Sequence, residues 1–275
     1  MTWAVRRFFH NEGYVEIDTP VRIAQPAMEL HIDAEPSGTW YLRTSPELHM
    51  KRLLAEGHPN IFQIGPCFRT GEYGERHRPE FTLLEWYRTD TDAMGILDET
   101  QRLLHFVAAE IQRRQEDLEP WEILDVAEAF ERHAGWNPVE AFDADRFDLD
   151  LVDQVEPALS REHPVVLKNY PAELGALARI NPDDPRTAER WELYLGGLEI
   201  ANAYTELTDP VEQRRRFEAW GVERAAMGKA VYGLDEAFLE ALTHMPPAGG
   251  IALGMDRLAM FFCGSADIGD VMSFS

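Results

Sequence analysis

Two arginines and two glutamates in this sequence are of the types that bind a nucleotide. Arg69 lies in CFRTGEYGERHRPEF, and Arg257 lies in GGIALGMDRLAM near the other end of the chain. Glu192 and Glu199 lie between them, on either side of a Gly-Gly pair. The planar guanidinium of arginine binds phosphate through a fixed fork of donors, and paired carboxylates hold the magnesium that accompanies a nucleotide. The sequence therefore predicts an enzyme that uses ATP.

The Gly-Gly pair predicts a tight β-hairpin that brings the two glutamates together. A two-residue turn would place Glu192 opposite Ala201, so that Glu192 and Glu199 become diagonal neighbours on one face of a sheet. Two carboxylates in that arrangement can share one cation. The simpler interpretation is a solvated acidic pair on an exposed sheet face. The polar run EIANAYTEL, which continues the second strand among apolar residues, favours the cation site.

Composition predicts a folded chain with a large core. The 275 residues are 45% hydrophobic and include seven tryptophans, and one domain of this size is as plausible as two. Cys67 and Cys263 lack the spacing of metal ligands, and each lies in an apolar run, which favours reduced, buried thiols. No apolar stretch reaches the roughly 18 residues that cross a bilayer. We expect a soluble, cytoplasmic protein.

The net charge of −23 argues against extensive binding to nucleic acid. The 49 acidic residues outnumber the 26 basic ones, so most of the surface would repel a polyanion. A local basic pocket for one triphosphate remains compatible with this charge. The chain has no GxxxxGK[ST] segment, so that type of phosphate-binding loop is excluded.

Apolar periodicity and turn residues predict helices mixed with strands and no regular βαβ alternation, which favours the α+β class. The loop at 70–79 should join two antiparallel strands into a hairpin. The predicted helices cover 2–12, a segment starting at Ser45-Pro46, 92–115, 122–134 and 210–228. The predicted strands cover YVEI after Gly13, then 61–68, 80–88, 188–205 and 249–254.

Three segments of the chain resemble the signature motifs of class II aminoacyl-tRNA synthetases. They are the first helix and strand with Pro20, then FRTGE through PEFTLLEWY, and finally GIALGMDR. The segments TSPELHMKRLL and RWELYLGGLEIANAYTELTD resemble the lysine branch of that family. The resemblance covers nearly the whole chain. It implies an antiparallel β-sheet flanked by helices, a single catalytic domain over residues 1–275 with an insertion at 120–187, and a homodimer.

The resemblance points away from tRNA as the acceptor. Lysyl-tRNA synthetases carry an anticodon-binding β-barrel before the catalytic domain, whereas this chain begins at the first motif, so we expect no anticodon-binding domain and no stable tRNA binding. A stand-alone domain resembles the bacterial ligases that attach (R)-β-lysine to a lysine of translation elongation factor P. Ser45 and Ala252 match those ligases, which typically have serine and alanine at these positions. The tRNA enzymes usually have alanine and glycine there. An added methyl and an added hydroxyl would reshape the pocket for a β-amino acid.

The resemblance also assigns roles in ATP binding. Arg69 would hold the α-phosphate and the substrate carboxylate, and Arg257 would clamp the γ-phosphate. Phe81 would stack on the adenine ring. Glu72 and His77 would lie in a loop that closes over the triphosphate. The usual motif has glutamate two residues after the arginine, whereas here glycine takes that place and Glu72 follows it.

The remaining roles concern the cation and the amino acid. Glu192 and Glu199 would hold Mg²⁺ between the phosphates. Glu47 would meet the α- or β-amino group of lysine or (R)-β-lysine, and Asn202 would meet its carboxylate. The distal ammonium would face Glu85, Tyr87 and Glu206, which would select a cationic side chain because a neutral analogue leaves buried negative charge unpaired.

Three other functions fit the same residues. One is aminoacylation of a tRNA acceptor stem, and another is transfer of the activated amino acid to a different amine acceptor. The third is a module that binds lysine or ATP without chemistry, which predicts damage among the catalytic residues. Arg69, Glu192, Glu199 and Arg257 are all present, so an enzyme is favoured.

Overall fold

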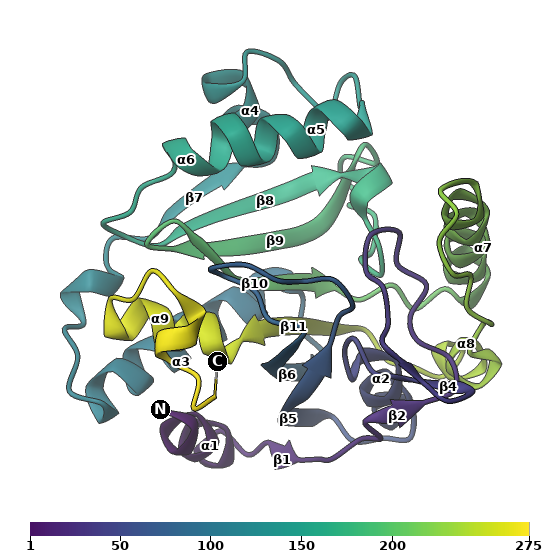
Figure 1. Ribbon diagram of the computed structural model, residues 1–275, viewed down its shortest axis with the longest axis horizontal. Helices are drawn as coiled ribbons and strands as arrows, with labels where there is room; N and C mark the ends of the chain where they lie inside the picture. Colours follow the sequence, from purple (N-terminus) through teal and green to yellow (C-terminus); the bar gives the residue numbers. More distant parts are fainter. Residues whose placement is uncertain (275) are drawn as a thin grey trace. The chain divides into compact units, whose positions relative to one another are not determined.

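The computed structural model describes residues 1–274, which divide into two compact units (Figure 1). The first unit comprises Met1–Phe8, Thr91–Leu207 and Gly249–Ile251. The second comprises Phe9–Asp90, Thr208–Ala248 and the chain from Ala252 onward. Helix α1 (Thr2–Asn11) and strand β11 (Ala248–Gly254) each continue from one unit into the other.

The first unit is built on four neighbouring strands in the order β10-β9-β8-β7. Strand β9 pairs antiparallel with both β10 and β8, whereas β7 and β8 are parallel. The strands are β7 (Glu122–Asp125), β8 (Val165–Pro171), β9 (Thr187–Leu195) and β10 (Leu198–Thr205). The helices are α3 (Ala93–Glu110), α4 (Val126–His133), α5 (Ala144–Asp150) and α6 (Glu156–Ala158), with short 3₁₀ or π turns at Glu116–Leu118, Leu151–Val155 and Ala172–Leu174.

The β9–β10 hairpin has the predicted two-residue turn. Gly196 and Gly197 have φ angles of 62° and 78°, and Leu195 pairs with Leu198 across the turn. Two consecutive residues in the left-handed region define the turn type whose twist matches that of the flanking strands, and glycine adopts it without a steric penalty. The Gly-Gly pair therefore fixes where the hairpin reverses.

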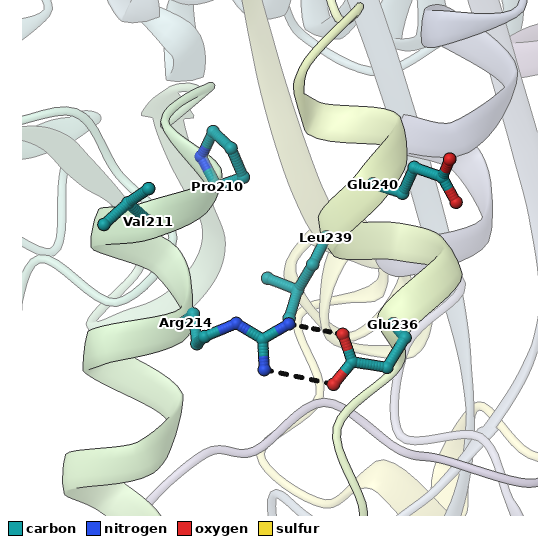
Figure 2. Close-up of a pocket in the computed structure, with 6 residues that line it drawn as sticks. All are labelled: Pro210, Val211, Arg214, Glu236, Leu239 and Glu240. Carbon is teal, nitrogen blue, oxygen red and sulfur yellow. Dashed lines mark hydrogen bonds and ion pairs between the residues drawn. The ribbon is translucent and has the colours of Figure 1, made fainter.

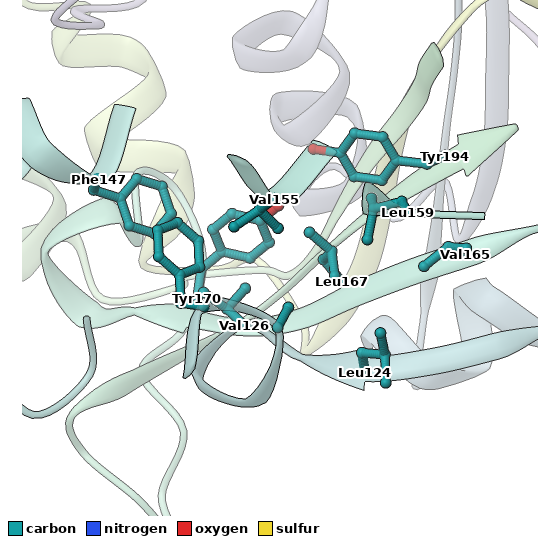
Figure 3. Packing of buried hydrophobic residues seen from close by; sticks show 11 residues of the cluster. Leu124, Val126, Phe147, Val155, Leu159, Val165, Leu167, Tyr170 and Tyr194 are labelled. Atoms are coloured by element: carbon teal, nitrogen blue, oxygen red, sulfur yellow. The ribbon is translucent and has the colours of Figure 1, made fainter. Parts of the chain in front are cut away.

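Helices α4 and α5 cover one face of β7, β8 and β9 (Figure 1). The core between them is aromatic: Phe130 of α4 stacks on Phe147 of α5 with ring centroids 4.6 Å apart. Tyr170 of β8 and Tyr194 of β9 belong to the same cluster, whose members are drawn in Figure 3. Most of this cluster comes from residues 120–187, so that segment supplies strands β7 and β8 as well as the helices that cover them.

The second unit contains the strand order β1-β5-β6 and a small three-stranded sheet in the order β2-β4-β3. Strands β5 and β6 pair antiparallel over their full length, and β1 is parallel to β5. The strands are β1 (Val15–Glu16), β2 (Arg22–Ile23), β3 (Pro36–Ser37), β4 (Trp40–Leu42), β5 (Asn60–Phe68) and β6 (Glu80–Thr89). The helices are α2 (Glu47–Ala55), α7 (Pro210–Ala226), α8 (Glu236–Leu242) and α9 (Met255–Cys263), and a 3₁₀ turn lies at Ile268–Asp270.

Several helix ends follow from single residues. The side chain of Asp92 accepts a hydrogen bond from Gly95 N at the start of α3. Asp209 caps α7 in the same way, with Pro210 in the first turn, and Asp235 caps α8. Gly264, with φ of 68°, ends α9. These caps satisfy backbone groups that would otherwise lack partners at helix termini.

The α+β class is confirmed, and the pairs β5–β6, β8–β9 and β9–β10 are antiparallel as predicted. The pairs β1–β5 and β7–β8 are parallel, so the strands form mixed sheets. Parallel neighbours require a crossover connection, and α4 to α6 provide it between β7 and β8. The helix predicted at 122–134 begins only at Val126, because residues 122–125 pair with β8 instead. The helix predicted at 92–115 ends at Glu110.

The environment of the cysteines matches the prediction in one case only. Cys67 is buried, whereas Cys263, at the end of α9, is exposed. An apolar neighbourhood in sequence did not predict burial there, because the last turn of α9 turns this side chain outward. No helix within residues 1–274 has the length and apolar character to span a membrane.

The aromatic core of the first unit yields a stability prediction. Phe147 is 2% exposed. Phe147→Ala should lower the free energy of unfolding by about 3–5 kcal/mol, because transfer free energy and packing contacts are both lost. Urea unfolding measures the change. Leu149 lies in the same helix but is 60% exposed, so Leu149→Ala should stay within about 0.5 kcal/mol of the wild type. Equal effects of the two variants would contradict this account of the core.

Candidate active site

Arg69 lies directly after β5, at the base of the β5–β6 hairpin. Its backbone N donates to Pro79 O at 2.9 Å, which closes the loop that carries residues 70–79. The guanidinium lies over the ring of Phe81, with Cζ 5.0 Å from the ring centroid, and Nη1 is 3.7 Å from Glu72 Oε1. Within residues 1–274, the buried Nε has no hydrogen-bond partner. A buried donor without an acceptor is costly, so this arginine is preset for an anionic ligand.

Arg257 lies at the start of α9 and faces the same loop. The preceding residue, Asp256, fixes the helix because its carboxylate accepts from Thr82 N at 2.7 Å. Arg257 Nη2 lies 2.5 Å from His77 Nε2, and Arg257 Nε donates to Arg76 O at 3.4 Å. The structure therefore brings four predicted phosphate-site residues of the second unit, Arg69, Glu72, His77 and Arg257, onto one loop and the helix beside it.

Burial and the contact with Arg257 both favour the neutral form of His77. Desolvation lowers the pKa of His77, and the positive charge of Arg257 lowers it further. The imidazole is therefore neutral at pH 7, and its Nε2 lone pair accepts from the guanidinium. A neutral histidine holds the arginine in place without adding a repulsive charge. His77 thus acts on Arg257, a role that the sequence pattern did not identify.

A buried carboxyl, Glu85 of β6, lies at the centre of the predicted amino-acid pocket. The Ser45 hydroxyl donates to Glu85 Oε1 at 2.6 Å and accepts from Glu47 N at 2.9 Å. The Tyr87 hydroxyl donates to Glu85 Oε2 at 3.1 Å. Burial, followed by the negative charge of Glu47, raises the pKa of Glu85 to about 8. The structure therefore brings Ser45, Glu47, Glu85 and Tyr87 together.

Two buried cations beside this pocket were missed from sequence. Lys51 Nζ lies 2.5 Å from Glu47 Oε1, and the lysine side chain is 1% exposed. Arg43, also buried, donates to Thr19 O and Pro66 O at 2.9 Å. The four-residue spacing of Glu47 and Lys51 on a helix was the available signal for the first contact. Nothing in the local sequence of Arg43 indicates that it is buried.

The β9 strand presents a polar row on one face. Glu192 Oε2 accepts from Tyr170 OH at 2.6 Å and from Tyr194 OH at 2.8 Å, and Oε1 lies 2.5 Å from Arg190 Nη2. Burial, then the charge of Glu192, raises the pKa of both tyrosines well above the usual range, so they stay protonated donors. Arg190 and the two tyrosines were not identified from sequence.

A β-bulge decides which residues of β10 share this face. Glu199 pairs with Tyr194 as predicted, but the register shifts after it, so Glu192 faces Asn202 and not Ala201. Directly opposed residues lie on the same face of a sheet. The bulge therefore places Asn202 on the face that already carries Glu192 and Glu199. Asn202 Oδ1 accepts from Arg190 Nε at 3.2 Å, which joins it to Glu192 through one guanidinium.

The carboxylates of this face fit a magnesium ion chemically. Mg²⁺ prefers hard oxygen ligands, and it is commonly bound by one or two carboxylates. A carboxylate offers about four lone-pair sites, so the three donors on Glu192 leave one for a cation, while Glu199 is partly exposed. Residues 1–274 contain no group of three or more His, Cys, Asp or Glu side chains arranged to hold a metal. Any ion here would take its other ligands from substrate and water.

The two remaining predicted residues, Glu206 and Ala252, belong to different units. Glu206, 2% exposed, follows β10 and forms an isolated bridge with Ala178. Ala252 lies in β11 and is partly exposed. The predicted residues are divided between the units: the first unit contains Glu192, Glu199, Asn202 and Glu206, and the second contains Ser45, Glu47, Arg69, Glu72, His77, Phe81, Glu85, Tyr87, Ala252 and Arg257.

Comparison with known proteins shows the family of this chain. The family model for tRNA synthetases class II (D, K and N) matches residues 1–275. The chain belongs to this family. The predicted resemblance is thereby confirmed, and with it the α+β class and an enzyme of the ATP-dependent amino-acid ligase type, since that is the chemistry of the family.

The chain is also similar over nearly its full length to curated bacterial proteins. It is 38% identical to an "Elongation factor P--(R)-beta-lysine ligase" of Hamiltonella defensa and 38% identical to the protein of that name from Pasteurella multocida. It is 36% identical to the one from Erwinia tasmaniensis. Each alignment covers 98% of this chain and 91% of the relative.

The raised pKa of Glu85 predicts a pH dependence of stability. The native state holds a proton that the unfolded chain releases near the ordinary value of 4.5, so the free energy of unfolding falls as pH rises from there through about 8. Glu85→Gln cannot titrate and should lose less stability across this range. Urea unfolding at about pH 5 and about pH 8 compares the two proteins.

An exposed carboxyl on the same strand provides the control. Glu80→Gln should retain the wild-type pH dependence, because its side chain is solvated. If Glu85→Gln and the wild type lose stability in parallel between the two pH values, Glu85 does not hold a proton in the native state.

Proposed function

We propose that this protein is an ATP-dependent ligase that activates (R)-β-lysine, or lysine, as an adenylate and transfers it to a lysine side chain of translation elongation factor P. The observation that carries this proposal is the identity of 36–38% over 98% of the chain to relatives that bear the name of that ligase. The charged site residues of both units support it, because arginine suits a nucleotide and carboxylates suit Mg²⁺ and a cationic amino acid.

ATP would bind on the β5–β6 hairpin of the second unit. The unpartnered Nε of Arg69 would donate to the α-phosphate or to the substrate carboxylate, and Phe81 would stack on the adenine. Arg257, held by His77, would bind the γ-phosphate. Glu72 lies within ion-pair distance of Arg69 and would keep this guanidinium oriented before the nucleotide arrives. These donors are preset, so little reorganisation accompanies the reaction.

The distal ammonium of the amino acid would bind at Glu85. In the free protein this carboxyl is largely protonated at pH 7, and an arriving ammonium would release the proton and form an ion pair. Tyr87 and Ser45 orient the carboxyl from either side. Glu206 would add a second carboxylate, and Glu47 would meet the α- or β-amino group. A neutral side chain would not displace the proton, which supports selection for a cation.

Ser45 and Ala252 would tune the choice between β-lysine and lysine. The Ser45 hydroxyl contacts both Glu85 and the backbone of Glu47, so it links the sites proposed for the two amino groups. Asn202 would bind the substrate carboxylate. Glu192 and Glu199 would hold Mg²⁺, which would neutralise phosphate charge when bound.

The reaction would proceed in two steps. A carboxylate oxygen of the amino acid attacks the α-phosphorus, a new P–O bond forms, and the bond to the β-phosphate oxygen breaks to release pyrophosphate. The ε-amino group of the acceptor lysine then attacks the adenylate carbonyl, an amide forms, AMP departs and the amine proton passes to solvent. Arg69 and Arg257 contribute by positioning and by stabilising negative charge, and no protein nucleophile is involved.

The proposal extends to assembly and location. We propose a single catalytic domain that works as a homodimer, supported by the amphipathic helix α1, whose Trp3 is 71% exposed. We also propose a cytoplasmic location, which the proposed acceptor, a protein factor of translation, supports. The acidic net charge of −23 does not favour stable tRNA binding.

The deciding experiment measures AMP formation from ATP and Mg²⁺ with (R)-β-lysine or lysine, each with and without unmodified elongation factor P. We expect preference for the β isomer and label on the factor. Label on tRNA with the factor untouched would refute the proposed acceptor, and no adenylate formation with either amino acid would refute the enzyme.

An arginine pair tests the catalytic assignment. Arg69→Ala should lower the rate of adenylate formation by about 10²–10³, because a preset donor to the reacting phosphate is lost. Arg186→Ala, which removes an exposed guanidinium paired with Asp184, should leave the rate unchanged. A rate in Arg69→Ala equal to that of Arg186→Ala would exclude Arg69 from the reaction.

A further inference from the structure

A fully buried arginine of α7 lies outside the residues assigned to the reaction. Arg224 is 0% exposed. Its guanidinium donates to Glu29 O at 2.6 Å and Ile32 O at 2.9 Å, and it lies 2.5 Å from Asp33 Oδ1. Burying a guanidinium is costly unless every donor finds an acceptor and the charge is balanced. The carbonyls of segment 29–33 supply acceptors and the Asp33 carboxylate supplies opposite charge, so hydrogen bonds and an ion pair join this segment to α7.

Tyr232 fixes the end of the same segment. Its hydroxyl accepts from Arg224 Nη2 at 3.2 Å and from Ala34 N at 2.9 Å, and the guanidinium also lies over its ring. Residues 26–33 form no helix or strand. Their conformation therefore depends on donors supplied from α7 and on the Tyr232 hydroxyl.

The other side of this segment binds the residue next to Arg69. Thr70 N donates to Asp33 O at 2.8 Å, and the Thr70 hydroxyl donates to Glu35 Oε2 at 2.8 Å. Asp33 thus accepts from Arg224 through its side chain and from Thr70 through its backbone. A continuous chain of hydrogen bonds runs from α7 to the loop that carries Arg69.

We propose that Arg224 is a positioning residue that sets the Arg69 loop for ATP through Asp33 and Thr70. This inference rests on the proposed function for the identity of the ligand. Movement of segment 29–33 would shift the anchor of Thr70 and, with it, the adjacent guanidinium of Arg69. Sub-ångström positioning of a phosphate donor matters because the donor must meet the charge where it develops. Within residues 1–274 this chain of bonds leads to Thr70, beside Arg69, and does not include Glu85, so the effect falls on the ligands that Arg69 would bind.

The test uses two variants within this chain of bonds. Arg224→Lys retains the charge but loses the planar fork, and Asp33→Ala removes the carboxylate that accepts from it. Each should raise the KM for ATP and weaken equilibrium binding of ATP by about three- to tenfold. Binding of ATP is measured by calorimetry on the full chain, and melting temperature is recorded for each variant.

Arg214 of the same helix provides the matched control. It pairs with Glu236 of α8 at a surface pocket, with one bond of 3.0 Å (Figure 2). Arg214→Lys should leave both the KM for ATP and the affinity for ATP at wild-type values, because within residues 1–274 the hydrogen bonds of Arg214 go to Glu236 and not to segment 29–33.

A double variant separates positioning from general stability. If Arg224 acts through Asp33, the combined loss of ATP affinity in Arg224→Lys with Asp33→Ala should be smaller than the product of the single losses. Additive losses, or ATP affinities equal to that of Arg214→Lys, would overturn the proposal. If Arg224→Lys lowers the melting temperature strongly, Tyr232→Phe replaces it in the same cycle. Because ATP binding is read directly, failure of the ligase reaction in the wild type would refute the proposed function without affecting this test.

Discussion

Buried charge is the constraint on which much of this structure depends. Arg43, Glu85 and Arg224 are almost completely removed from solvent. Arg43 and Arg224 stay there because acceptors compensate the loss of water, and Glu85 stays there because it keeps a proton. Backbone carbonyls of irregular segments supply many of these acceptors. The loops of the second unit are consequently ordered around its buried cations, and apolar packing contributes the remaining stability.

The same constraint prepares the site for its ligands. Three donors hold the Glu192 carboxylate in place and leave one lone-pair site open. Where compensation is incomplete, a ligand can supply it. Arg69 has a buried Nε that lacks an acceptor within the described chain, and Glu85 keeps a proton near neutral pH. Arg69 can therefore bind an anion and Glu85 a cation, as the proposed reaction between a nucleotide and a cationic amino acid requires.

Much of the fold was predictable because its signals are local. The Gly-Gly pair requires two residues in the left-handed region and so fixed the β9–β10 turn, and the β5–β6 hairpin followed from two apolar runs around a charged loop. The strand at 122–125 was mistaken for helix because it is short and gains its identity from pairing with β8. Exposure of Cys263 likewise depends on the direction of a helix face, which its apolar neighbours do not specify.

The sequence by itself determined which residue types are present, where the hairpins turn, and that the motifs belong to class II synthetases, because motif spacing and turn chemistry are properties of neighbouring residues. Only the tertiary structure decided which side chains meet. The bulge after Glu199 carries Asn202 to the face of Glu192, although two-residue alternation would put it on the other side. Burial decided that Glu85 keeps its proton and that Arg224 reaches Asp33, 191 residues away in sequence. Such contacts depend on long-range packing, which no local pattern encodes.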